Sequence, residues 1–380
     1  MGPLKGIKVL EFVGIGPGPF LGKILNDFGA EIVRVKKMYS FTNFFDTSNN
    51  PEITIDLKHP QSVEICRRLA SRSDVLIDPY RPGVLERLNL GPETLLKLND
   101  RLVIARLTGY GQTGPFSQKG SHDLNFLALS GVLSLIGYED KPPIAPLNLV
   151  GDFGGGSMLG AFAIVAALYE RSLSGRGQII DHSLTEGTGY ISTFVWQTMK
   201  FKPIFWPNFP RRNANLLDNG CPFYRCYECA DKKFIAVASG EEKFYENLLA
   251  VLKPKSSLNR FDIKNWPSIS EEFARIIRTK TRDEWCELFD KTDACVTPVL
   301  ELDEASLHHH NLYRKSFDRE KDLPLPAPRF SRTILDSHND SGDEAKENES
   351  NRSNESTEIL KQLNFSDSEI DKMSSMGIFE

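Results

Sequence analysis

The sequence predicts an α/β protein with two parts: a large Rossmann-like domain built on a parallel sheet, and a smaller α+β domain. From residue 4 to residue 107, short apolar segments alternate with helical ones, which is typical of a parallel sheet covered by helices on both faces. The chain has 380 residues, more than the roughly 250–300 at which a single core stops growing. We therefore expect two domains.

The chain opens with a β-α-β pattern. Residues 4–13 predict a strand, residues 14–19 a tight Gly/Pro turn, residues 20–28 a short helix, and residues 32–35 a second strand.

Such an opening can bind a dinucleotide, but NAD requires an acidic residue after the second strand for its ribose hydroxyls. This chain carries Arg34, Lys36 and Lys37 at that place. These cations either suit a phosphorylated ribose or form a solvated cluster at the end of the strand. The cations therefore argue against a nicotinamide dehydrogenase.

The alternation continues with strands at 53–58, 74–77 and 102–107 and helices at 60–72 and 92–98. Ligands of open parallel sheets bind at the carboxyl ends of the strands. Arg81 and Arg87 follow one such end. Each arginine either binds an anionic group there or forms a surface ion pair.

Residues 109–156 organise the rest of the chain. Glycine is frequent in this segment, as it is where the backbone turns tightly or approaches a ligand. His122 lies on a predicted loop, and Asp152 directly precedes an apolar helix predicted for 157–169. The helix N-terminus would lower the pKa of Asp152 and burial would raise it. Alone, His122 could be a structural loop residue and Asp152 a helix cap. Together they suggest proton transfer.

The remainder predicts a strand at 179–182, an aromatic-rich helix at 185–200, a linker at 201–220 and a small domain at 221–305. Within the small domain we expect strands near 223–226 and 233–238 and helices near 243–252, 270–278 and 282–289. We expect segments 306–335 and 358–380 to complete the large domain, residues 1–200. Residues 336–357 contain one apolar side chain, Ala345, and predict a disordered acidic insertion.

Composition excludes several classes of protein. A net charge of −5 gives no general reason to expect nucleic-acid binding. We see no apolar run near the roughly 20 residues that span a bilayer and no secretory signal, so we expect an intracellular protein without a membrane segment. Cys221, Cys226 and Cys229 have iron–sulfur-like spacing, but no suitable fourth ligand follows, and the side chains of His308 to His310 diverge. We therefore expect no metal.

Several motifs together match a known family. They are Leu4 to Glu11, Pro17-Gly18-Pro19-Phe20, Asp27 to Glu31, Ile55 to Lys58, Arg81-Pro82-Gly83-Val84, Thr108 to Gly114 and Gly177-Gln178. On these motifs the chain resembles the family III CoA-transferase superfamily over nearly its whole length. His122 to Phe126, Ala145 to Phe153, Glu241 and Asp293 to Val299 resemble the racemases of 2-methylacyl-CoA within that superfamily.

The resemblance implies the family III CoA-transferase fold, an interlocked homodimer and a 2-methylacyl-CoA substrate inverted between R and S without metal or redox cofactor. It implies two bases, His122 and Asp152, with Glu241 reaching the site from the partner subunit to orient or polarise His122. We expect amides around Asp152 to Gly154 to stabilise the enolate. The expected CoA-binding residues are Arg34, Lys58, Arg81, Arg87, Gly109, Tyr110, Gly111, Asp123 and Asn125.

Two other functions stay open at this point. One is a CoA transferase in which Asp152 is the nucleophile, although the motif around His122 is foreign to transferases. The other is a non-catalytic CoA-binding protein, against which the intact His122, Asp152 and Glu241 argue. The resemblance suggests a peroxisomal or mitochondrial location, with the cytoplasm as an alternative. The C-terminal residues lack the usual peroxisomal tripeptide.

Overall fold

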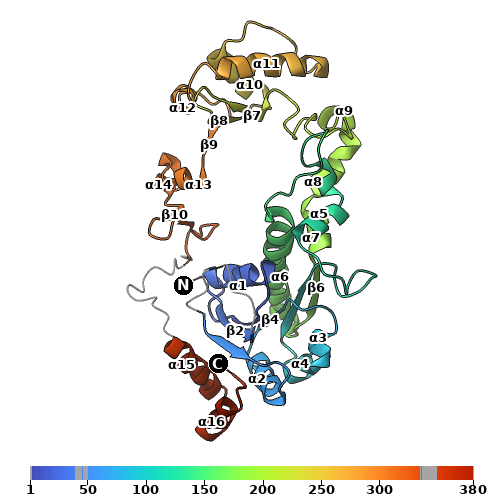
Figure 1. Cartoon of the computed structure of the whole chain (residues 1–380), viewed down its shortest axis with the longest axis vertical. Helices are drawn as coiled ribbons and strands as arrows, with labels where there is room; N and C mark the ends of the chain where they lie inside the picture. Colours follow the sequence, from blue (N-terminus) through green and yellow to red (C-terminus); the bar gives the residue numbers. More distant parts are fainter. Residues whose placement is uncertain (1, 39–44, 46–49, 334, 336–348, 380) are drawn as a thin grey trace. The chain divides into compact units, whose positions relative to one another are not determined.

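The computed structural model describes residues 2–38, 45, 50–333, 335 and 349–379. The chain divides into two compact units (Figure 1). Unit 1 comprises Met1–Ser130, Pro146–Ile191 and Pro326–Glu380, and unit 2 comprises Gly131–Ala145 and Ser192–Leu325.

Unit 1 is built on a six-stranded sheet whose strands pair in parallel. The strand order is β3-β2-β1-β4-β5-β6. The bounds are β1 Lys8–Phe12, β2 Glu31–Lys37, β3 Glu52–Ile55, β4 Val75–Asp78, β5 Val103–Thr108 and β6 Ile179–Ser183. The predicted parallel sheet is confirmed. Because the order reverses between β1 and β4, a crevice is expected at the carboxyl ends of these strands.

The helices of unit 1 follow the predicted alternation. They are α1 Pro17–Asp27, α2 Pro60–Ser71, α3 Val84–Arg87, α4 Pro92–Leu98, α5 Asp123–Leu129, η2 Leu149–Met158, α6 Leu159–Ser174, α7 Leu184–Ile191, α15 Glu349–Gln362 and α16 Asp367–Ser375.

Alternate side chains of each strand enter two separate cores, one on each face of the sheet. Val9, Val75 and Val103 pack with residues of α1, α5 and α6. Leu10 and Leu76 pack with residues of α2, α4, α15 and α16. Side chains of a strand point alternately to the two faces, so a sheet covered on both sides needs the continuous apolar strands seen in the sequence.

The segment from η2 through α6 forms one helical run, Leu149–Ser174. We expected no apolar run of membrane-spanning length, yet by length and composition alone this helix could cross a membrane. It reaches that length because the glycine-rich residues 149–158 are helical as well. Part of it packs in unit 1, where Ala161, Ile164 and Ala167 are buried. The core helix of a soluble protein passes the same test.

Unit 2 contains a three-stranded antiparallel sheet of order β7-β8-β9, Tyr224–Glu228, Phe234–Ala238 and Val296–Val299. Its core includes the fully buried Leu248 and Ile277. The helices are η1 Val132–Leu135, α8 Thr193–Thr198, η3 Met199–Phe201, α9 Lys202–Phe205, α10 Glu242–Leu252, η4 Ile263–Asn265, α11 Trp266–Ile277, α12 Arg282–Phe289, α13 Leu302–Ala305 and α14 His309–Arg314. A short hairpin pairs β10 Phe317–Asp318 with β11 Leu323–Pro324.

The observed units differ from the predicted domains at three places. Segments 131–145, 192–220 and 306–325 belong to unit 2, whereas we expected them in the large domain or in a linker. One physical reason is Arg212, which donates to the carbonyl oxygens of Tyr138 and Lys141 at 3.0 and 2.6 Å. These bonds fasten the predicted linker to the segment that follows α5.

The predicted disordered insertion, 336–357, is only partly tested. Residues 336–348 lie outside the described part of the chain, and residues 349–357 are helical because α15 begins at Glu349. The prediction of disorder is therefore wrong for 349–357. The later residues of α15 supply the anchor, since Ile359, Leu360 and Leu363 are buried in the core of unit 1.

We expect Leu360→Ala to lower the free energy of unfolding by about 2–5 kcal/mol, because Leu360 is fully buried and its loss leaves a cavity. The neighbouring, exposed Glu358 provides the control, and Glu358→Ala should change stability by less than about 0.5 kcal/mol. Urea denaturation of both variants measures the difference. Equal midpoints would show that the C-terminal helices do not belong to the core.

Candidate active site

A cavity of about 1030 Å³ lies in unit 1 at the carboxyl ends of the central strands. Its walls come from the turn after β1 (residues 13–18), the segment after β4 (79–81), the end of β5 with the following loop (107–110 and 117–122) and the first turn of η2. This is the edge at which open parallel sheets bind their ligands. The cavity is therefore the candidate active site.

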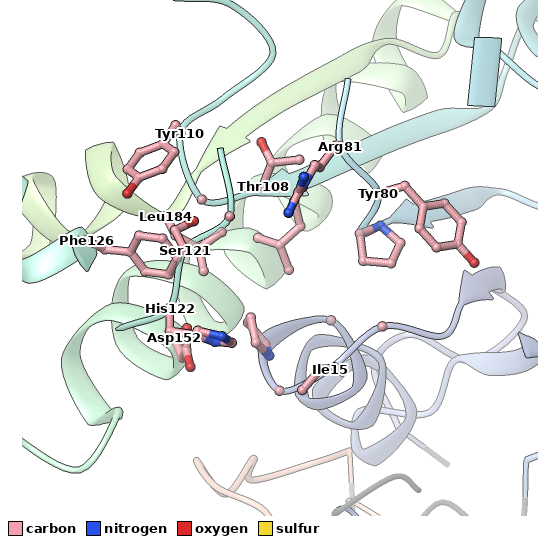
Figure 2. Close-up of a pocket in the computed structure, with 18 of the residues that line it drawn as sticks. Ile15, Tyr80, Arg81, Thr108, Tyr110, Ser121, His122, Phe126, Asp152 and Leu184 are labelled. Carbon is pink, nitrogen blue, oxygen red and sulfur yellow. The ribbon is translucent and has the colours of Figure 1, made fainter. Parts of the chain in front are cut away.

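His122 and Asp152 both line this cavity. In Figure 2 their side chains lie next to each other, and Ile15 of the glycine-rich turn lies on another part of the wall. His122 is exposed and directly precedes α5. Its backbone N–H donates to Oδ1 of Asn125 at 3.1 Å, so Asn125 caps the helix. Asn125 was an expected CoA ligand, but it lies outside the described lining of the cavity.

Asp152 is buried in the first turn of η2, which has the wide π-helical form often found at functional sites. Its Oδ2 accepts a hydrogen bond of 2.8 Å from the side-chain amide of Asn148. Burial raises the pKa of Asp152, the nearby Asp123 carboxylate raises it further, and Asn148 and His122 oppose the increase. The sequence left open whether burial or the helix N-terminus has the larger effect on this pKa, and in the structure burial has the larger effect. The carboxyl group is more easily protonated than an ordinary aspartate.

Asn148 is a site residue that sequence analysis missed. It lines the cavity and adopts a left-handed backbone conformation with φ of 61°, which asparagine tolerates better than most residues. This conformation ends the preceding loop and brings the amide back to a carboxylate four residues later. The Asn-x-x-x-Asp spacing is present in the sequence, but the left-handed conformation that brings the two side chains together could not be read from it.

Asp123 is buried and connects the two segments that carry His122 and Asp152. Its Oδ1 accepts hydrogen bonds of 2.8 Å from the backbone N–H groups of both Gly151 and Asp152. These contacts give Asp123 a structural role, and its expected role as a CoA ligand stays a prediction. They also mean that the Asp152 amide already has an acceptor, so it does not suit the predicted role of enolate donor.

The glycine-rich turn after β1 closes the cavity beside Asp152. Gly16 has φ of 67°, and a Cβ there would lie 3.8 Å from Oδ2 of Asp152. The opposite side of η2 packs closely against α7, where a Cβ on Gly155 would lie 2.5 Å from the backbone nitrogen of Thr188. Glycine is therefore needed at position 16 for its positive φ and at position 155 for the close approach of η2 to α7.

The expected ligands Gly109 and Tyr110 line the cavity, whereas Gly111 lies outside the described lining. The loop that carries them is held by two neighbours. Thr185 donates its hydroxyl to the carbonyl oxygen of Gly109 at 2.8 Å, and Asp181 accepts from the backbone N–H of Gln112 at 3.0 Å.

Three cationic side chains line the cavity: Lys37, Arg81 and Lys119. Arg81 was expected, and its guanidinium donates to the carbonyl oxygen of Gln118 at 3.3 Å. From the sequence, Lys37 was only part of a charge cluster, and Lys119 was not among the expected ligands. Among the described residues no carboxylate forms an ion pair with any of the three, which leaves their charge available to an anionic ligand.

The other expected CoA cations lie outside the described lining. Arg34 is 2% exposed. It lies between Glu11, at 3.4 Å from its Nε, and Glu52, at 3.2 Å from its Nη1. Burial raises the pKa of Glu11 to about 7, and Arg34 opposes this increase. Lys58 and Arg87 are exposed on the same unit.

Glu241 belongs to unit 2, where it is exposed and precedes α10. Its predicted role beside His122 stays a prediction. Within the described part of the chain, no group of three or more His, Cys, Asp or Glu side chains could hold a metal ion. The three consecutive histidines 308–310 are thus not brought together with further ligands among those residues.

Three comparisons relate the chain to known proteins. The model of CoA-transferase family III matches residues 4–339. The chain is 44% identical to the α-methylacyl-CoA racemase of Mus musculus, over 99% of this chain and 97% of that protein. It is 43% identical to the Homo sapiens α-methylacyl-CoA racemase with the same coverage.

A solved structure, a CAIB/BAIF family protein from Brucella suis, superposes with a TM-score of 0.74 and covers 88% of this chain and 94% of its own. Its sequence identity is 22%, so this likeness concerns the fold alone. The family match spans most of the chain and the full-length relatives exceed 40% identity. The chain belongs to CoA-transferase family III.

Proposed function

We propose that this protein is a racemase that interconverts the R and S forms of 2-methylacyl-CoA thioesters. The observation that carries the proposal is the pair His122 and Asp152 on the wall of one cavity. Identity of 43–44% to two α-methylacyl-CoA racemases over nearly the whole chain supports the same reaction.

The reaction requires two proton carriers. A thioester carbonyl makes the hydrogen on Cα acidic, and inversion removes it from one face and returns a proton to the other. Two acid/base groups on opposite sides of the carbon meet this requirement, together with a donor for the enolate oxygen. In this proposal His122 serves one face and Asp152 the other, and CoA enters only as part of the substrate, without a separate cofactor.

The protonation of Asp152 suits this role. A group that both removes and returns a proton works best when its pKa is not far from the working pH. Burial raises the pKa of Asp152 toward that range. The hydrogen bond from Asn148 stabilises the ionised form and fixes the carboxylate in one orientation.

The enolate donor must come from outside the start of η2, because the Asp152 amide donates to Asp123 and the Phe153 amide to Asn148. The first N–H groups of a helix lack intrahelical partners. Helix α5 begins directly after the cavity-lining His122. The Asn125 amide already donates to the carbonyl oxygen of His122, so the amides of Asp123 and Leu124 are our candidates for the enolate oxygen.

The cavity also suits an anionic CoA thioester. Lys37, Arg81 and Lys119 line it, and the lining contains a single carboxylate, Asp152, among the described residues. Phosphates of CoA would find cations here without competition from nearby acidic groups. Arg34, Lys58, Arg87 and Gly111 stay predicted ligands by resemblance alone.

A homodimer with composite sites is part of the proposal. Five apolar side chains around and after the η2–α6 junction are each more than 40% exposed: Met158, Phe162, Val165, Tyr169 and Leu173. Their spacing of three or four residues places them on one face. Such a stripe of exposed apolar side chains is typical of a protein interface, and a second copy is the proposed partner. Glu241 would reach His122 from that copy.

The location of the protein in the cell stays a prediction. We propose a peroxisomal or mitochondrial protein, with the cytoplasm as the alternative, because racemases of 2-methylacyl-CoA act in lipid metabolism.

We expect deuterium from solvent to enter Cα of a 2-methylacyl-CoA as the enantiomers interconvert. His122→Ala and Asp152→Ala should each lower inversion by about 10²–10⁴-fold, the usual contribution of a general acid or base. Mass spectrometry measures the exchange and chiral chromatography the inversion. The exposed His310 and Asp140 supply the controls His310→Ala and Asp140→Ala, which should leave both rates unchanged.

The same experiment distinguishes the rival activities. Transfer of CoA to a free carboxylic acid without α-exchange would replace the racemase by a CoA transferase that uses Asp152 as nucleophile. Binding of the thioester with neither exchange nor transfer would favour a non-catalytic protein.

A second prediction concerns Asn148. Asn148→Gly removes the amide and keeps a residue that accepts positive φ. Because that amide lowers the pKa of Asp152, its loss should raise this pKa. For the enantiomer whose α-proton Asp152 removes, the acid limb of kcat/KM should then move to higher pH. We also expect kcat to fall about tenfold, the size of one hydrogen bond to a charged group.

Profiles of kcat/KM against pH, measured from both enantiomers, test this effect. An acid limb that stays in place would show that Asn148 does not act on Asp152.

A further inference from the structure

A buried arginine lies behind the cavity wall and has no part in the mechanism above. Arg106 is on β5, 6% exposed, and its neighbour across the parallel pair is Asp78 at the end of β4. Nε of Arg106 donates to Oδ2 of Asp78 at 3.0 Å. Arg106 is absent from the described lining of the cavity, so its effect on a ligand has to pass through other residues.

Asp78 shapes the segment that follows β4. It is fully buried, and its second oxygen, Oδ1, accepts a hydrogen bond of 2.9 Å from the backbone N–H of Tyr80. The turn so formed carries Pro79, Tyr80 and Arg81 into the cavity wall. Burial raises the pKa of Asp78 to about 6, while this backbone bond and Arg106 oppose the increase.

The other side of the Arg106 guanidinium holds helix α3. Nη1 donates to Oε1 of Glu86 at 2.7 Å and Nη2 to Oε2 at 3.3 Å. This is the bidentate arrangement in which arginine binds a carboxylate most specifically. Arg106 thus binds both ends of the segment 78–86, whose loop carries Arg81, and Arg87 follows immediately.

We propose that the Arg106–Glu86 pair positions the cation Arg81 for the phosphates of the CoA thioester. The inference rests on the proposed function, which supplies the CoA ligand. In it Arg106 and Glu86 are positioning residues that do not touch the substrate.

One physical effect favours this role. A loop that is already fixed loses less conformational entropy when its side chains bind a ligand. Arg106 fixes the loop through both oxygens of Glu86. Lysine could not replace Arg106, because an ammonium group does not form the planar fork.

Glu86 offers the cleaner test, because its side chain is 44% exposed whereas Arg106 and Asp78 are buried. Removal of Glu86 leaves the buried Arg106–Asp78 pair intact, so the variants should fold. We expect Glu86→Ala and Glu86→Asp each to weaken binding of free CoA about tenfold, because both break the bidentate pair. Glu93→Ala on α4, which removes an exposed carboxylate nearby, is the matched control and should bind CoA normally.

Calorimetric titration with free CoA measures this effect independently of racemase activity. Kinetics with the full protein then give the second readout: KM for the acyl-CoA should rise about tenfold, and kcat should stay within about twofold. With an acyl-pantetheine thioester, which lacks the diphosphate and the ribose phosphate, the Glu86 variants should match the wild type.

Three results would overturn the proposal. If the Glu86 variants bind CoA normally and only their melting temperature falls, the Arg106–Glu86 ion pair has a purely structural role. Tighter CoA binding would show that the Glu86 charge merely repels phosphate. Equal losses for acyl-CoA and acyl-pantetheine would place the effect at the thioester end. Absence of α-exchange in the wild type would contradict the racemase, while the CoA titration would still decide the positioning role.

Discussion

The geometry of the site depends on the carboxylate of Asp123. This buried side chain follows His122 in the chain and accepts hydrogen bonds from the backbone N–H groups of Gly151 and Asp152. A carboxylate that receives two amide bonds in the interior binds strongly, because both the charge and the amides would otherwise be buried without partners. The two proposed bases are therefore fixed to each other through their immediate neighbours, over a sequence separation of 30 residues.

The sheet supplies the second constraint. Its strand order reverses between β1 and β4, and the loops that leave these strands and β5 build the cavity. One side of the cavity holds the proposed acid/base pair, and Arg81 comes from the segment after β4. Buried ion pairs beneath this edge, Arg106 with Asp78 and Arg34 with Glu11, fix the strand ends. Within the described part of the chain, charged groups thus form two layers: ion-paired ones below the edge, and cations without a carboxylate partner on the wall.

Much of the fold was predictable from sequence, because its signals are local. Apolar alternation located the six strands of the large sheet, and the motif around His122 pointed to the residues that now share a cavity with Asp152. What the sequence left out depends on tertiary contacts. Arg34 stays a predicted CoA ligand, but its place opposite Glu11 follows from the pairing of β1 with β2. The role of Asn148 depends on its left-handed backbone conformation at the start of a π-helix, which no local sequence signal predicts. Residues 349–357 look disordered by composition, yet they form the first part of α15, whose later residues are buried.

The most direct test of this account is a crystal structure of the protein with a stable enolate-like analogue of a 2-methylacyl-CoA thioester. We predict that the His122 imidazole and the Asp152 carboxylate lie on opposite faces of the planar reacting carbon, each within hydrogen-bonding reach of about 3 Å. Asp123 should still accept from the Gly151 and Asp152 amides. Both groups on one face of that carbon, or a thioester bound away from either group, would contradict the account.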